Sequence, residues 1–181
     1  TASLEKDAAS IITSTGVQAS LIDEVKILIA YPQGLYALDE GDGDKFSAGA
    51  GYKVEIQLDR DGFGDFMIIE GNQSVGGTSV FGHGGDYRTA VTFEFRIGLE
   101  EFQPFNAFKI RITRLTQHDF NAAGGVPRYG SLTLTGNDEH KIIGTAQLQA
   151  VTGLIKEKLN FPYTAYANVK LNSKTFNNMP T

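Results

Sequence analysis

The sequence contains no cysteine and no tryptophan, and only two of its 181 residues are methionine. The missing cysteine excludes a disulfide framework, a cysteine-ligated zinc site and a cysteine nucleophile. It indicates no cellular compartment, because a cysteine-free chain suits oxidising and reducing surroundings equally. The missing tryptophan removes the aromatic side chain that sugar-binding sites favour.

Positive charge and long apolar runs are also scarce. The chain has 16 Lys and Arg against 21 Asp and Glu, a formal net charge of −5, so it lacks the basic footprint of a nucleic-acid-binding protein. No apolar run approaches the about 20 residues of a membrane-spanning helix, and the first residues do not resemble a signal peptide. Because the chain begins at Thr1 without a methionine, we expect a segment of a longer polypeptide or a processed product.

Alternation of apolar and polar residues dominates the sequence. The run 52–59 alternates without a break and predicts a strand with one wet face, and the Asp61-Gly62 turn joins it to the run 66–69 in a hairpin. Further strands are predicted at residues 25–30, 91–99, 108–114 and 131–135. Short strands with few helices between them favour an antiparallel sandwich or a partly open barrel over a parallel α/β sheet.

The C-terminal part differs in pattern. Thr145 can cap a helix in which Leu148, Val151, Leu154, Ile155 and Leu159 form an apolar stripe, and Pro162 ends it. A strand over 163–171 follows. The predicted fold is therefore mainly β: an antiparallel, β-sandwich-like domain with one C-terminal amphipathic helix and a following strand. We expect a domain over 1–140 and a linking helix and strand over 141–181, or one continuous domain over 1–181.

Three segments have ambiguous or irregular patterns. The first twenty residues suit either a short helix or a pair of edge strands, over 10–15 and 17–21. The segments 71–86, with six glycines, and 117–130 are predicted to be long loops.

An acidic segment offers the oxygen ligands that calcium prefers. Asp39, Glu40, Asp42 and Asp44 lie close together, but no register completes the alternation and distal Glu of a calcium loop. A solvated acidic turn is the favoured interpretation, and a calcium site the alternative.

No catalytic pattern is found. The three histidines, His83, His118 and His140, are far apart and outside any metal-binding motif, so they are interpreted as exposed loop residues. Segment 71–86 has neither the lysine of a P-loop nor a Gly-x-Ser-x-Gly elbow. We predict a protein that is not an enzyme and needs no cofactor.

Most of the nineteen aromatic residues fall at alternating strand positions, where core packing is the simpler explanation. Tyr31, Tyr36, Phe81 and Tyr87 flank or occupy predicted loops and are the best candidates for exposed aromatics, and Phe81 and Tyr87 are retained as candidate interface residues.

Four segments, in order, resemble one family. The run Phe108–Thr116 (FKIRITRLT) is similar to an I-R-V-T-R-L-T strand, and 158–166 (KLNFPYTAY) to K-L-R-Y-P-x-T-A-L. The segment 172–181 resembles D-A-E-Q-F-x-x-I-P-T, although Asn172 replaces the acidic residue, and 15–27 echoes T-P-V-T-x-x-L and V-D-x-V-R-V. The chain thus resembles the N-terminal or central tail-hub region of the tail tip attachment proteins of lambda-like phages, the host specificity or protein J family.

The resemblance implies a structural and interaction module of a virion, located at the tail tip of a phage or prophage and made in the bacterial cytoplasm. Its implied partners are other tail-tip and hub proteins. In the full-length protein a homotrimer is implied, with a host outer-membrane receptor bound by regions outside this sequence. Phe161, Tyr163 and Tyr166 become candidate interface anchors, with packing inside the domain as the alternative. The competing hypotheses for the whole chain are a carbohydrate-binding or adhesin β-sandwich module and, less favoured because no catalytic motif is found, a small hydrolase or metal-dependent enzyme.

Overall fold

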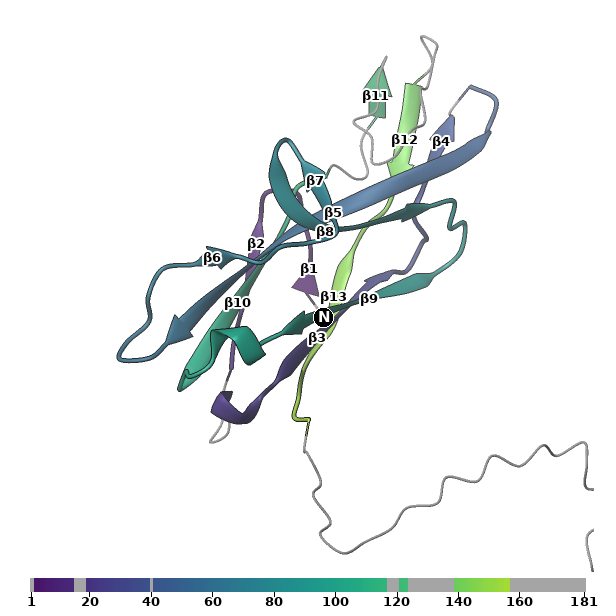
Figure 1. Cartoon of the computed structure of the whole chain (residues 1–181). Helices are drawn as coiled ribbons and strands as arrows, with labels where there is room; N and C mark the ends of the chain where they lie inside the picture. The colour runs from purple at the N-terminus through teal and green to yellow at the C-terminus, as the bar shows by residue number, and fades with distance from the viewer. Residues whose placement is uncertain (1, 15–18, 40, 117–120, 124–138, 157–181) are drawn as a thin grey trace, which may run out of the picture.

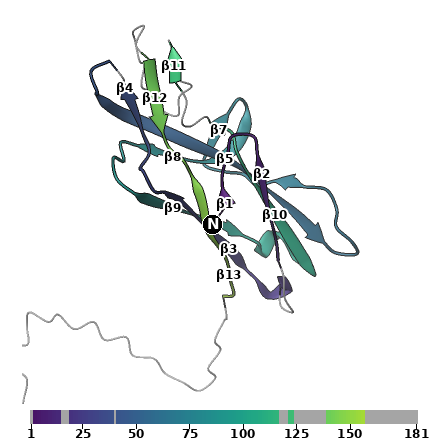
Figure 2. The ribbon, with the colours of Figure 1, turned by 180° about the vertical axis from the view of Figure 1, so that it is seen from behind.

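The chain is built from antiparallel strands (Figures 1 and 2). The computed structural model describes residues 2–14, 19–39, 41–116, 121–123 and 139–156. Among these residues there is no α-helix, only two short 3₁₀ turns, η1 (Ala19–Leu21) and η2 (Glu100–Phe102). The strands are β1 (Ala2–Ser3), β2 (Ala9–Thr13), β3 (Glu24–Tyr31), β4 (Tyr36–Asp39), β5 (Lys45–Asp59), β6 (Met67–Ile68), β7 (Gln73–Val75), β8 (Thr78–Gly85), β9 (Val91–Gly98), β10 (Ala107–Arg114), β11 (Asn121–Ala123), β12 (Glu139–Ile143) and β13 (Gln147–Leu154).

Within the described residues the strands form two sheets. The smaller sheet has the order β1-β13-β3-β9, and the larger has the order β11-β12-β4-β5-β10-β2, with β6, β7 and β8 attached beside it. The 15-residue β5 organises the larger sheet, because it pairs with β4, β8, β6 and β10 along its length. The long diagonal strand in Figure 1 is β5.

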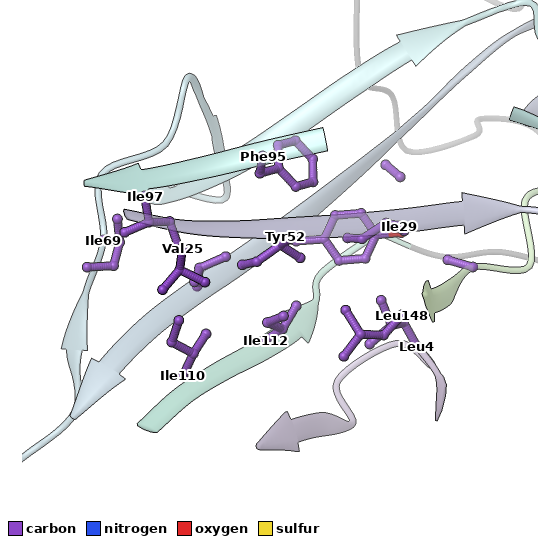
Figure 3. Close-up of a cluster of buried hydrophobic side chains, with 14 of the residues drawn as sticks. Leu4, Val25, Ile29, Tyr52, Ile69, Phe95, Ile97, Ile110, Ile112 and Leu148 are labelled. Atoms are coloured by element: carbon purple, nitrogen blue, oxygen red, sulfur yellow. The ribbon is translucent and has the colours of Figure 1, made fainter. Parts of the chain in front are cut away.

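Side chains of both sheets meet in one core. Alternate residues of β3 point inward, so that Val25, Ile27 and Ile29 are at most 1% exposed. Figure 3 shows Val25 and Ile29 together with Tyr52 of β5 and Ile112 of β10. Burying each such aliphatic side chain contributes about 1.5–3 kcal/mol, so this strip of residues is a main source of stability.

A hydrogen-bonded polar group lies inside this core. The Tyr31 hydroxyl is 2.5 Å from that of Tyr52 and 2.8 Å from His83 Nε2. His83 also stacks on Phe93, with ring centroids 3.7 Å apart. Arg114, fully buried, donates from Nη1 to the Gly144 carbonyl at 2.5 Å. Because Tyr31 belongs to β3, and Tyr52 and His83 to β5 and β8, these hydrogen bonds join the two sheets.

Burial changes the acid–base chemistry of this group. Desolvation raises the pKa of both tyrosines, which therefore remain hydroxyl donors and acceptors at neutral pH. Desolvation, helped by the nearby Arg114 charge, lowers the pKa of His83 to about 3. The imidazole is thus neutral at physiological pH. The prediction that His83 is an exposed loop residue is wrong.

The alternating patterns predicted most of the central strands correctly. The runs 25–30, 52–58 and 108–114 fall in β3, β5 and β10, and the run 91–99 falls in β9 except for Leu99, which follows the last residue of the strand. The predicted hairpin also forms, since β5 pairs with β6 and Gly62 has a φ of +118°. The strands predicted over 131–135 and 163–171 lie outside the described residues.

The helix predicted over Thr145–Leu159 is wrong where the structure describes it, because residues Gln147–Leu154 form strand β13. β13 pairs with β3, and the register shifts between Leu148 and Ala150. This bulge inserts one residue, so Leu148 and Val151, opposite Ile29 and Ile27, are three residues apart and both contact the core. A spacing of three is typical of a helix, which explains the error. Residues 157–159 lie outside the described residues.

The long loop predicted over 71–86 is also wrong. Residues Gln73–Val75 and Thr78–Gly85 form the hairpin β7–β8, and β8 pairs with β5. Its tip is Gly76-Gly77, where both residues have positive φ. Most of the segment 117–130 lies outside the described residues, apart from β11.

The ambiguous N-terminal segment contains a strand. β2 pairs with β10, with Ile11 opposite Arg111. The second predicted edge strand is absent at residues 19–21, which form η1.

We predict that His83 makes stability depend on pH between about 6.5 and 3. In this interval the unfolded state binds a proton at His83 whereas the folded state does not, so stability falls as the pH is lowered from 6.5. From pH 6.5 to pH 5 this effect should lower the free energy of unfolding by roughly 1–2 kcal/mol, and His83→Gln should abolish that decrease. Urea unfolding of both proteins at several pH values between 6.5 and 5 measures this free energy. If the free energy of unfolding falls equally with pH in the parent chain and in His83→Gln, the prediction is wrong.

Candidate functional site

The acidic segment forms the turn between β4 and β5. Asp39 Oδ1 accepts the Gly41 N–H at 2.7 Å, and Asp42 Oδ1 accepts the Asp44 N–H at 2.9 Å. Asp39 is buried, whereas Asp42 and Asp44 are exposed. One carboxylate oxygen of each of two residues therefore stabilises the turn. Glu40 lies outside the described residues, and among those described no group of three or more His, Asp or Glu side chains has the arrangement of a metal site.

The five predicted interface residues are not gathered at one place. Phe81 points into the core, where its ring centroid is 5.4 Å from that of Phe95. Tyr87 is 38% exposed and packs edge-on against Phe93, with centroids 5.2 Å apart. Its ring also covers Gly85, where an added Cβ would come within 2.4 Å of it. Tyr87 thus remains a surface candidate. Phe161, Tyr163 and Tyr166 lie outside the described residues.

The structure uses other potentially reactive groups for local folding. Asp59 Oδ1 accepts the Gly62 N–H at 2.9 Å, and Ser79 Oγ accepts the Gly71 N–H at 2.9 Å. Asp61 and Asp65 are exposed in the same hairpin. His118 and the side chain of His140 lie outside the described residues. In the part of the chain that is described, these groups close turns and do not converge on one cleft.

The best candidate for a functional surface is the outer face of the larger sheet, which the sequence did not single out. Four residues form one row across β2, β10, β5 and β6, because the registers pair Ile11 with Arg111, Arg111 with Glu55, and Glu55 with Ile68. Directly paired residues point to the same face. We call this surface the outer-face platform; it comprises Ile11, Lys53, Glu55, Phe63, Phe66, Ile68, Lys109 and Arg111.

An ion-pair network holds the centre of the platform. Arg111 donates to both oxygens of Glu55, from Nε at 2.7 Å and from Nη2 at 2.6 Å, and Lys53 Nζ is 3.3 Å from the same carboxylate. The hydrogen bond from Arg111 is the main cause of the lowered pKa of Glu55. A bidentate pair fixes the guanidinium plane as well as its position. The centre of the platform is therefore rigid and carries an excess of positive charge.

Aromatic and aliphatic side chains surround this network. The Arg111 guanidinium lies 4.0 Å from the centre of the Phe66 ring, and Lys109 Nζ lies 3.9 Å from that of Phe63. Ile11 and Ile68, at the two ends of the row, are 56% and 53% exposed. An exposed apolar rim around ordered cations is a feature of protein interaction surfaces, where arginine and aromatic residues are enriched.

A second charged surface lies on the smaller sheet. On β9, Arg96 pairs with Glu94 at 2.5 Å and with Glu24 of β3 at 3.2 Å, and Lys26 lies 3.9 Å from Glu94. Lys156, beyond β13, pairs with Glu24 at 3.2 Å. Arg96 and Lys156 are exposed whereas Glu24 is half-buried, and pairs with such an exposed member contribute little to stability. They do order the side chains along the last strand of this sheet.

Sequence alternation indicates that the odd-numbered residues of β5 face water, which is correct for Lys53 and Gln57, while Glu55 on the same face is covered by Arg111. It does not indicate which residues of other strands lie beside them. The platform depends on the registers of β2 and β6, both short strands at the periphery of the sheet, and one residue of slip would turn Ile11 and Ile68 to the other face.

Comparisons with known proteins give no assignment. No protein family model matches the chain, and no curated protein sequence matches it either. No helix among the described residues is long and apolar enough to cross a membrane.

We predict that Arg111→Met lowers the free energy of unfolding by about 1–3 kcal/mol, because among the described residues it leaves the buried Glu55 carboxylate with Lys53 as its only paired cation. The matched control is Lys109→Met on the same strand, whose cation lies over the exposed Phe63 and should contribute less than about 1 kcal/mol. Urea unfolding at neutral pH measures both. If Arg111→Met and Lys109→Met lower the free energy of unfolding equally, the Arg111–Glu55 ion pair contributes no more to stability than the exposed Lys109 cation.

Proposed function

We propose that the chain is a structural and interaction module of the tail tip attachment protein of a phage or prophage, acting in assembly of the tail hub. The observation that carries this proposal is the ordered series of four segments that resemble that family and extend over nearly the whole chain. Phe108–Thr116 contains all of β10 except Ala107, and β10 lies between β5 and β2 in the larger sheet; the residues Glu24–Ile27 of the first segment begin β3. The resembling residues thus include core strands.

The architecture supports a role as a scaffold. Two antiparallel sheets that share one core are the arrangement of a β-sandwich, and we propose this fold for the module. β13 pairs with β3, so residues 147–154 are part of the same unit as the N-terminal strands. In such a module, function is presented by surfaces on a rigid framework.

The outer-face platform is the surface that we assign to a tail-tip partner. Its cations are already held by Glu55 and by the rings of Phe63 and Phe66. A side chain that is ordered before binding loses less conformational entropy when the partner arrives. Ile11 and Ile68 provide apolar area at both ends of the row. The proposed location is the virion tail tip, and the proposed contribution to host adsorption and DNA delivery is indirect.

The test is co-assembly with the tail proteins encoded beside the parent gene. Co-expressed with them, the chain should elute as a stable complex, and Ile11→Asp combined with Ile68→Asp should weaken that complex at least 10-fold, because two apolar contacts are lost. Met67→Asp is the matched control, since Met67 is similarly exposed but points to the opposite side of β6.

Three results would count against the proposal or against the platform as its contact surface. If the parent gene stands alone, away from tail genes, the tail-tip assignment fails. If the isolated chain instead binds glycans or whole cells directly, with no affinity for tail proteins, the adhesin hypothesis replaces it. If the Met67 control weakens the complex as much as the platform variant, the platform is not the contact surface.

A further inference from the structure

β9 leaves one side of its backbone without a strand partner among the described residues. It is the last strand of the smaller sheet, and β3 pairs with it from Tyr31 opposite Val91 to Glu24 opposite Gly98. The eight residues contain no proline, and their pairing with β3 has no register shift. A long regular strand of this kind is a template for adding another strand.

Alternation of the ladder identifies the residues whose backbone groups face the open side. The Leu99 N–H donates to the Asp23 carbonyl at 2.7 Å, so Leu99 and every second residue before it form the hydrogen-bonded pairs with β3. The intervening residues, Thr92, Glu94, Arg96 and Gly98, direct their N–H and C=O groups away from β3. All four are exposed.

Charge distinguishes the registers in which this edge can pair with an identical, antiparallel edge. The registers that the backbone alternation allows include Glu94 opposite Glu94, Arg96 opposite Arg96, and Glu94 opposite Arg96. The first two place like charges directly opposite each other, which is destabilising. The third places Glu94 against Arg96 of the second copy and, by symmetry, Arg96 against its Glu94. The edge is therefore complementary to itself in one register.

The inward face agrees with the same register. In the register that pairs Glu94 with Arg96, Phe95 lies opposite Phe95 of the second copy and Phe93 lies opposite Ile97 of the second copy. Phe95 and Ile97 are buried in the core, whereas Phe93 is only partly covered. An added strand would cover Phe93 with an aliphatic side chain and extend the apolar layer from one copy into the next.

We propose that β9 is a self-association edge, through which two copies of this chain pair antiparallel with Phe95 at the centre. The smaller sheets of the two copies then form one continuous sheet. Such an isologous contact joins two copies and no more, so a threefold assembly of a longer protein would use a different surface. The proposal does not rest on the tail-tip function, because its evidence is the geometry of β9 alone.

Sedimentation velocity of the full chain tests the association, with a concentration series up to about 1 mM, where even a pair with a Kd near 1 mM is partly formed. The weight-average mass should rise from 19.6 kDa toward twice that value as the concentration increases. Glu94→Arg and Arg96→Glu should each be monomeric, because each creates two like-charge contacts. An equimolar mixture of the two variants should recover the dimer, as should the single chain carrying both changes.

Folding controls separate a lost contact from a lost structure. Glu94 and Arg96 are exposed, so each variant should keep a cooperative thermal transition close to that of the parent chain. A monomeric parent chain at 1 mM, a trimer, a dimer that both variants retain, or a mixture that stays monomeric would each overturn the proposal.

Cysteine pairs test the register directly, since the chain has no cysteine of its own. Directly opposed residues in a hydrogen-bonded pair have Cα atoms about 5.5 Å apart, within reach of a disulfide. Glu94→Cys mixed with Arg96→Cys in a glutathione buffer should give a disulfide-linked heterodimer, and neither variant alone should crosslink. Crosslinking of Glu94→Cys with itself, or of Arg96→Cys with itself, would identify one of the like-charge registers and refute this one.

Discussion

The hydrogen bonds among Tyr31, Tyr52 and His83 are the constraint on which the packing of the two sheets depends. A buried polar group that loses its hydrogen-bond partner costs about 1–3 kcal/mol. The hydrogen bonds among these three side chains therefore favour one relative placement of β3, β5 and β8. Apolar contacts alone tolerate sliding, because they have no direction. The aromatic rings of Phe93 and Phe95 then pack around the imidazole, so the polar group also organises the inner face of β9.

The same constraint explains where the glycines lie. His83 reaches Tyr31 only if β8 lies close against β5, and His83 is flanked by Gly82 and Gly84 in β8, opposite Gly51 and Gly49 in β5. A Cβ at Gly84 would come within 3.1 Å of the Ala48 carbonyl oxygen. Beside it, the Asn72 side chain both donates to and accepts from the Gly82 backbone, in the manner of a neighbouring strand. The glycine content predicted a long loop, whereas these glycines permit close contact between strands.

Sequence reasoning succeeded where one strand determines its own pattern. β3, β5, β9 and β10 alternate because each has one face in the core, and no knowledge of neighbours is needed. It failed at β13, where a bulge opposite Leu28 and Ile29 imitates helical spacing, and at β8, where glycine hides the alternation. Both candidate surfaces depend on which residues of different strands are opposite each other, as with Arg111 and Glu55, and a single sequence contains no direct record of that register.

The two candidate surfaces are suited to different kinds of contact. On the outer-face platform the polar groups of Glu55 and Arg111 satisfy each other, so a partner gains chiefly by covering the apolar ends of the row. Along β9 the reverse holds, because Phe95 and Ile97 are already buried, and the groups without a strand partner in the described part of the chain are backbone donors and acceptors. A side-chain face accepts partners of varied backbone conformation, whereas an edge accepts only an extended strand. The edge is therefore the more selective surface, and the charge order of Glu94 and Arg96 restricts it further to a strand of matching sequence.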